Sequence, residues 1–161
     1  MSGWAWVRIG AFLGFLAVGL GAFGAHGLKD RLESLGTAAT FETAAQYHMY
    51  HALALVGVGL FAGPFRSSLA LTSAGLAFLF GLLIFSGTLY VLSVTGLKWL
   101  GAITPIGGVL LMIGWAAFAM AAGSAIPGTP PSGWSSDPAA ATPVSKPADF
   151  QVEIVGIEDA R

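Results

Sequence analysis

Two of the three histidines, His48 and His51, lie three residues apart in a stretch that has the composition of a membrane span. The stretch "FETAAQYHMYHALAL" begins at Phe41 and also carries Tyr47 and Tyr50. A His-x-x-His pair can hold a metal ion when further ligands are near. In lipid, the same side chains can instead form hydrogen bonds between helices. These residues are therefore the candidates for chemistry, with two interpretations open.

The rest of the sequence gives little support for a metal centre or an enzyme. The other possible ligands near the pair are His26 and Glu42, and the chain has neither a cysteine nor a His-Glu-x-x-His motif. No nucleophile beside a base and no phosphate-binding loop is recognisable. The net charge of −1, without a basic block, does not favour nucleic acid. We expect no enzymatic activity, no cofactor, no metal and no nucleic-acid partner.

The composition predicts an integral membrane protein. Of the 161 residues, 55% are hydrophobic and 9% are charged, whereas soluble domains carry roughly a quarter charged residues. Four uncharged apolar stretches, at about residues 9–25, 46–64, 69–95 and 104–122, are long enough to span a bilayer. We predict an all-α fold, a bundle of four transmembrane helices within residues 1–125. The first stretch also resembles a signal peptide, and its cleavage would leave three spans.

The order of the spans places most polar side chains toward one face of the bilayer. The first span ends, and the second begins, on the same face, to which the third returns. Two polar stripes on the second and third spans then lie at one depth and should face each other, because lipid cannot satisfy them. The predicted polar pocket consists of His26, Tyr47, His48, His51, Ser86, Tyr90 and Thr104. We expect a neutral His51, because an ionised one would be costly there, bonded to Tyr90 or Ser86.

Small residues at helical spacing predict close packing of the helices. In lipid, helices associate through close backbone approach over small side chains. The predicted packing positions, among 23 glycines, are Gly10, Gly14, Gly21, Gly24, Gly81, Gly107 and Gly114. A tight antiparallel bundle follows, although glycine is also simply common in membrane helices.

The segments between and after the spans carry their own signals. Residues 27–40 are polar, with Leu28, Leu32 and Leu35 on one helical face, which indicates a short interfacial helix or a connecting loop. Gly96 is a natural C-cap, and Thr104-Pro105 a natural helix start.

Residues 126–161 form a Pro/Ala/Ser-rich acidic tail, which we predict to be disordered. Five of the eight acidic residues lie in it. Its end, "FQVEIVGIE", alternates like a strand and is either a strand-adding docking peptide or a flexible chain end.

Four motifs in order resemble one family. They are "GAFGAHGL" at the end of the first span, "YHMYHALAL", "FSGTLY", and "TPIGG" followed by "GW". Over about residues 7–122 the chain resembles the domain of unknown function 423 family, the YgdD-like small multi-pass membrane proteins. The resemblance implies four helices and residence in the bacterial cell inner membrane, without an established activity. His48 falls where the family pattern does not require histidine, which weakens a metal pair with His51.

The features together favour a non-enzymatic accessory or assembly factor. Its partners would be the lipid bilayer, other membrane proteins or further copies of itself. The alternative is a small transporter or channel that uses the one-sided polar pocket for an ion or solute, although no acidic residue lies mid-span. A metal- or haem-binding subunit is the third interpretation. The positive charges are too evenly divided between the two sides to predict orientation.

Overall fold

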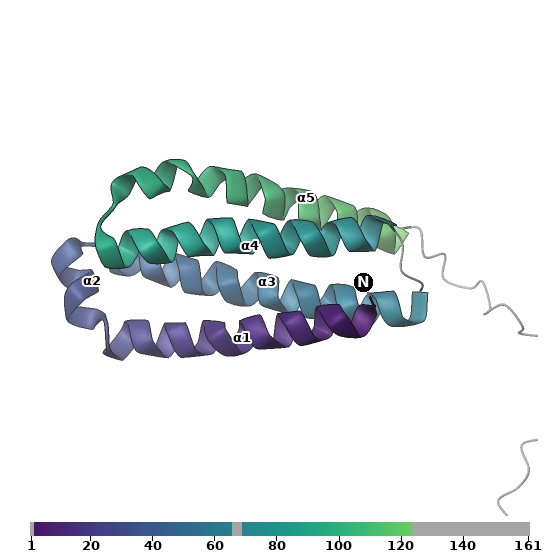
Figure 1. Ribbon diagram of the computed structural model, residues 1–161, viewed down its shortest axis with the longest axis horizontal. Helices are drawn as coiled ribbons and strands as arrows, with labels where there is room; N and C mark the ends of the chain where they lie inside the picture. Colours follow the sequence, from purple (N-terminus) through teal and green to yellow (C-terminus); the bar gives the residue numbers. More distant parts are fainter. Residues whose placement is uncertain (1, 66–68, 124–161) are drawn as a thin grey trace, which may run out of the picture. The chain divides into compact units, whose positions relative to one another are not determined.

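A computed structural model describes residues 2–65 and 69–123, and this part of the chain is helical without strands. Its elements are α1 (Gly3–His26), α2 (Lys29–Leu35), α3 (Ala38–Phe65), α4 (Leu69–Thr95), the 3-10 helix η1 (Lys98–Ala102) and α5 (Thr104–Gly123) (Figure 1). The all-α prediction is confirmed. The predicted acidic tail and its strand-like end lie outside the described residues.

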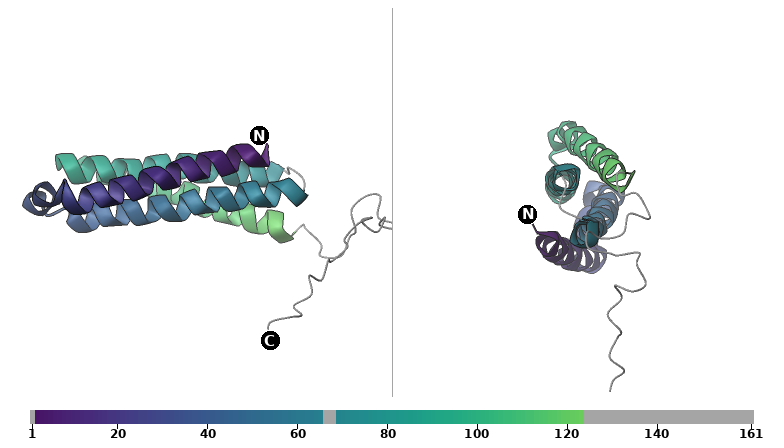
Figure 2. Two further views of the ribbon diagram at one scale, coloured as in Figure 1. Left: turned by 90° about the horizontal axis from the view of Figure 1, so that it is seen from below. Right: turned by 90° about the vertical axis from the view of Figure 1, so that its right-hand side faces the viewer.

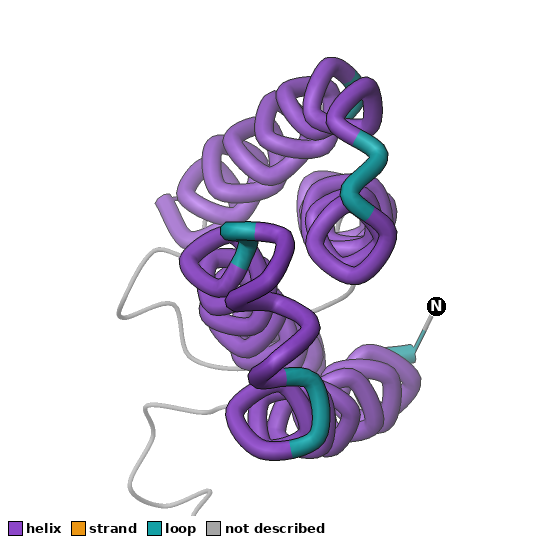
Figure 3. Tube along the Cα trace, turned by 90° about the vertical axis from the view of Figure 1, so that its left-hand side faces the viewer, coloured by secondary structure: helices purple, strands orange, loops and turns teal. Residues whose placement is uncertain are grey.

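The four long helices run side by side along one axis, with α2 and η1 at the same end (Figures 1 and 2). Each long helix is antiparallel to the next one along the chain. Helix α3 packs against α1 and against α4, and α4 packs against α5. Seen along this axis, the order across the bundle is α1, α3, α4 and α5 (Figure 3). Because α5 packs mainly on α4, it leaves part of α3 uncovered.

Three described helical stretches are long and apolar enough to cross a membrane: α1, α4, and residues 98–122 of η1 and α5. Helix α3 has 28 residues, which is ample length, but its first half carries Glu42, Gln46 and both histidines of the pair. Helices α1 and α3 begin well before the predicted spans do. At about 1.5 Å per residue, each of these two helices is longer than a hydrocarbon core of about 30 Å. The first turns of each can therefore extend beyond the core.

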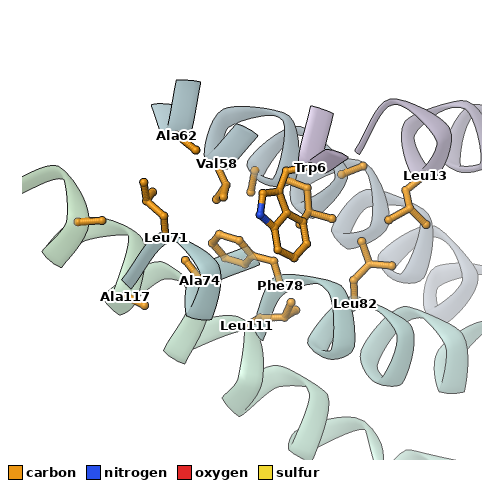
Figure 4. Packing of buried hydrophobic residues seen from close by; sticks show 14 residues of the cluster. Trp6, Leu13, Val58, Ala62, Leu71, Ala74, Phe78, Leu82, Leu111 and Ala117 are labelled. Atoms are coloured by element: carbon orange, nitrogen blue, oxygen red, sulfur yellow. The ribbon is translucent and has the colours of Figure 1, made fainter. Parts of the chain in front are cut away.

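The hydrophobic core contains buried side chains from all four long helices, including Leu111 and Ala117 of α5 (Figure 4). Its largest side chain is Trp6, which is 1% exposed. The indole packs on Gly75 of α4, where an added methyl group would lie 2.6 Å from the ring. The predicted first span begins at about residue 9, so it does not include Trp6. The space that Gly75 leaves is what allows this tryptophan to join α1 to α4.

Five of the seven predicted packing glycines are in close contact with a neighbouring helix, and at Gly10, Gly81 and Gly107 the contact includes backbone atoms. A methyl group on Gly10 would lie 2.7 Å from the carbonyl oxygen of Ala52. One on Gly107 would lie 2.5 Å from the backbone nitrogen of Phe85. Gly24 meets the Phe41 ring, and Gly81 and Gly114 meet Leu111 and Phe78.

The remaining two glycines are not close-packed. A methyl group on Gly14 would come only to 4.0 Å from the Ala52 side chain, and one on Gly21 would have no neighbour within 4 Å. The prediction of close packing at these two positions is therefore wrong. Gly21 instead lines a cavity between α1, α2 and α3, which interrupts the seam. Gly59, which was not predicted, does meet α1, at the carbonyl oxygen of Gly3.

The connections at the α2 end are held by two left-handed glycines and two hydrogen bonds. Gly36 ends α2 with φ 65°, and Gly96 ends α4 with φ 77°, the conformation for which glycine is suited. The prediction for Gly96 is confirmed, and residues 29–35 form a helix rather than a loop. Thr37 Oγ1 donates to the carbonyl of Ser93 at 2.7 Å, and Arg31 Nε donates to that of Val94 at 3.2 Å. These bonds tie the α2–α3 corner to the end of α4.

Candidate functional site

His51 is buried on α3 and bonded through both ring nitrogens. Its Nδ1 lies 2.8 Å from the carbonyl oxygen of Tyr47, one turn earlier, and Nε2 accepts from the indole Nε1 of Trp115 on α5 at 3.2 Å. A carbonyl can only accept and an indole nitrogen can only donate. A neutral His51 ring with its proton on Nδ1 can form both hydrogen bonds, because Nδ1 then donates to the carbonyl and Nε2 accepts from the indole. The predicted partners, Tyr90 and Ser86, are thus wrong, because His51 is turned toward α5.

His48, and not His51, contacts the polar side chain of Tyr90 on α4. Its Nδ1 lies 3.4 Å from the hydroxyl of Tyr90, and the two rings are edge-on. The Nε2 of His48 and the Oγ of Ser86 are buried with no hydrogen-bond partner among the described residues. Ser93 differs from Ser86, because its hydroxyl donates to the carbonyl of Leu89.

The remaining members of the predicted pocket lie elsewhere. Thr104 is buried at the start of α5, and its hydroxyl shares a hydrogen bond of 2.9 Å with that of Thr88 on α4. It also donates to the carbonyl of Leu100, so its hydroxyl links α4 to α5. His26 is exposed at the end of α1. The structure therefore divides the predicted pocket into separate places.

The side chains around His51 line a groove of about 390 Å³ between α3 and α5. Its walls consist of Tyr47, Tyr50, His51, Gly108, Leu111, Met112 and Trp115. Rings continue behind it: Tyr47 lies 4.7 Å from Phe85, and Phe78 lies 5.1 Å from Trp115 edge-on. Such ring contacts add stability beyond the area they bury. The groove therefore has a stiff aromatic wall.

Trp115 and the phenylalanines Phe78 and Phe85 belong to this site but were not predicted from the sequence. A usable signal was present, since Trp115 lies in the middle of a predicted span. Tryptophan in membrane helices concentrates at the interfaces, and an indole N–H within lipid needs an acceptor. An indole N–H within one span and a histidine ring within another are thus natural partners.

The groove offers packing surfaces more than reactive groups. Both nitrogens of His51 are already used, and the other walls are tyrosine, tryptophan and aliphatic side chains. Within residues 2–65 and 69–123, no three histidine, aspartate or glutamate side chains gather as a metal site would require. The arrangement is suited to holding an apolar surface against aromatic rings.

Comparison with known proteins decides the family. Residues 20–108 match the family described as "Protein of unknown function (DUF423)". The chain belongs to this family. The matched DUF423 region contains His48, His51 and Gly108 and ends before Trp115. The predicted resemblance is thereby confirmed.

Relatives of this DUF423 protein are membrane proteins by name. The UPF0382 membrane protein YwdK of Bacillus subtilis is 46% identical over 116 residues, which are 72% of this chain and 94% of the relative. A UPF0382 membrane protein of Staphylococcus epidermidis is 48% identical over 109 residues, 68% of this chain and 87% of the relative. No solved structure matches significantly. Together with its apolar helices, these matches make the chain a membrane protein of the DUF423 family.

Proposed function

We propose that this protein is a non-enzymatic accessory factor that binds a transmembrane helix of another membrane protein in the groove between α3 and α5. One observation carries the proposal: the groove exposes an aromatic and methionine surface in the apolar part of the bundle. Tyr50 is 56% exposed, Met112 65% and Trp115 49%. Aromatic residues and methionine are the types enriched where proteins bind one another.

The packing of α5 explains why a helix fits this place. Helix α5 is held by α4, through Gly107 and Gly114 against Phe85 and Phe78. It reaches α3 through side chains, such as the bond between Trp115 and His51. Gly108 faces the groove without a side chain, so a partner helix can approach α5 closely there. Because Trp115 and His51 already form a hydrogen bond with each other, a partner helix need not supply a hydrogen bond to either side chain.

The proposal includes a multi-pass arrangement of four spans in the cell inner membrane. Helix α3 lies between α1 and α4, both of which are apolar enough to cross, so α3 should cross the same layer. The chain contains no cysteine, which makes single-cysteine labelling direct. Ser2→Cys and Leu69→Cys should be labelled from one side of the membrane, and Ser34→Cys from the other, because Leu69 is 84% exposed at the start of α4. Labelling of Ser34→Cys and Leu69→Cys from the same side would exclude a crossing by α3.

Site-specific photo-crosslinking in intact membranes tests the docking groove. A photoreactive amino acid at Met112, within the groove, should give a discrete adduct with another membrane protein. The matched control is Ile113, which is 51% exposed on the same helix but does not line the groove. We expect no such adduct from Ile113.

A groove-filling variant makes the crosslinking specific. An added methyl on Gly108 would lie 3.7 Å from the Phe85 ring, an ordinary contact, so Gly108→Leu should fold and block the groove. It should abolish the Met112 adduct, whereas Gly19→Leu, in open space on α1, should leave it. An adduct with lipid only, one with the mass of two copies, or one that survives Gly108→Leu would contradict the proposal.

A further inference from the structure

A second cavity, of about 290 Å³, lies between the end of α1, α2 and the start of α3, away from the docking groove. Its floor is apolar and includes Gly21, Leu32 and Phe41. Leu32 and Phe41 are each 4% exposed, so this floor is a fixed part of the bundle. Gly21 is open to the cavity, since a methyl group there would have no neighbour within 4 Å.

The remaining wall of the cavity carries charge of both signs. Lys29 and Glu33 come from α2, and Glu42 comes from the first turns of α3. All three side chains are exposed, and the structure shows no ion pair or hydrogen bond for any of them within the described residues. The cavity thus combines one free ammonium group and two free carboxylates with an apolar floor.

From the placement of the charged residues, we infer that the cavity lies at the level of lipid headgroups. Of the seven charged residues in the described part of the chain, all but Arg8 lie at the end that carries α2 and η1. Charged side chains at the ends of membrane helices mark the interface with water. A ligand in the cavity would contact water and lipid headgroups at the charged wall. On the side of Gly21 it would contact lipid acyl chains.

We propose that this cavity binds the headgroup of a zwitterionic aminophospholipid. The primary ammonium of the lipid would donate to Glu33 and Glu42, and its phosphate would accept from Lys29. Charge-assisted hydrogen bonds of this kind are stronger than neutral ones. The first part of an acyl chain would lie over Gly21. This assignment does not depend on the docking groove, because the two sites share no lining residue.

The charges also predict which headgroups are disfavoured. The two carboxylates would repel an anionic glycerol headgroup that brings no ammonium. A choline headgroup cannot donate hydrogen bonds, and recognition of it normally needs an aromatic cage. Phe41 is the single aromatic side chain of this cavity. Phosphatidylethanolamine should therefore bind better than phosphatidylglycerol or phosphatidylcholine.

Lipid exchange on the full-length protein tests the site. Purified protein would be equilibrated with mixed vesicles of phosphatidylethanolamine, phosphatidylglycerol and phosphatidylcholine, and the retained lipids counted by native mass spectrometry. We expect about tenfold enrichment of phosphatidylethanolamine over the other two, the factor for one charge-assisted bond. Equal retention of the three lipids would overturn the proposal.

Two variants locate the binding. Gly21→Leu fills the cavity and should remove the enrichment, whereas Gly19→Leu, which is equally free of close neighbours but outside the cavity, should keep it. Glu42→Gln changes an exposed side chain, so it should fold even if Gly21→Leu does not, and should lower the enrichment about tenfold. Unchanged enrichment in Glu42→Gln would overturn the assignment.

Discussion

The indole nitrogen of Trp115 on α5 donates to Nε2 of His51 on α3 across 3.2 Å. This bond, together with the ring contacts of Phe78 to both side chains, joins α5 to α3, and both of these helices also pack on α4. Because the carbonyl of Tyr47 holds the other nitrogen of the ring, His51 is fixed in orientation. The bond therefore sets the back wall of the groove.

Removing either side chain of this bond should weaken the bundle modestly. Interhelical hydrogen bonds in membrane proteins contribute about 0.6 kcal/mol on average and at most roughly 1.7. His51→Leu and Trp115→Phe should each lower the free energy of unfolding in detergent, and the double variant should show a coupling of about 0.6 kcal/mol. Trp4→Phe, at a tryptophan 72% exposed, is the control. Fully additive effects would show that the bond contributes nothing.

Glycine substitutions should separate the true packing positions from the open ones. Gly10→Ala would force a methyl group to 2.7 Å from the Ala52 carbonyl oxygen, which is backbone and cannot move aside cheaply. Overpacking of this kind costs about 1–3 kcal/mol, measurable as a lower melting temperature. Gly21→Ala, in open space, should be as stable as the natural chain or slightly more so. Equal destabilisation of both variants would mean that α1 is misplaced.

Ser86 should be replaceable without loss of stability. Its hydroxyl is buried with no partner among the described residues, and burying an unpaired hydroxyl costs free energy. Ser86→Ala should be neutral or more stable by up to about 1 kcal/mol. Ser93→Ala, which removes a hydroxyl bonded to Leu89, is the matched comparison and should not be stabilising. A clear loss in Ser86→Ala would reveal that Ser86 holds a ligand or a partner outside the described chain.

The acidic tail should be dispensable for the bundle. Deleting residues 127–161 removes a Pro/Ala/Ser-rich segment whose composition cannot bury a core. Membrane insertion and the melting temperature of the truncated protein should match those of the full chain. A large fall in either would show that the tail packs against the helices.

Much of the helical layout could be predicted because it depends on local sequence. Apolar runs between charged residues define the long helices, and Gly96 marks the end of α4 because a left-handed residue favours glycine. The helix ends that were misjudged, Gly3 and Ala38, lie outside the apolar runs. Hydropathy reports the membrane core and not the extra turns that continue beyond it.

The candidate site was only partly predicted. Composition indicates which residues need hydrogen-bond partners, but it does not indicate which partners they find. The two histidines of α3 do lie within the bundle, as lipid requires, whereas Tyr47 and Tyr50 are exposed. The assignment of a partner failed at His51, because its depth placed it level with Tyr90 but did not show which side of α3 faces α4. The choice depends on the rotation of α3 about its own axis, which aims His48 at α4 and His51 at α5.

Hydropathy and family motifs are read residue by residue, and they suffice to identify an all-helical membrane protein of the DUF423 family. Other features follow only from the folded arrangement of the helices: which glycines touch a neighbour, that Trp6 fills the core, and that grooves remain beside α5 and α2. The physical reason is that close packing depends on the relative rotation and spacing of whole helices. A shift of one residue turns a helix face by about 100°, and the repeated small residues of this chain allow several such rotations.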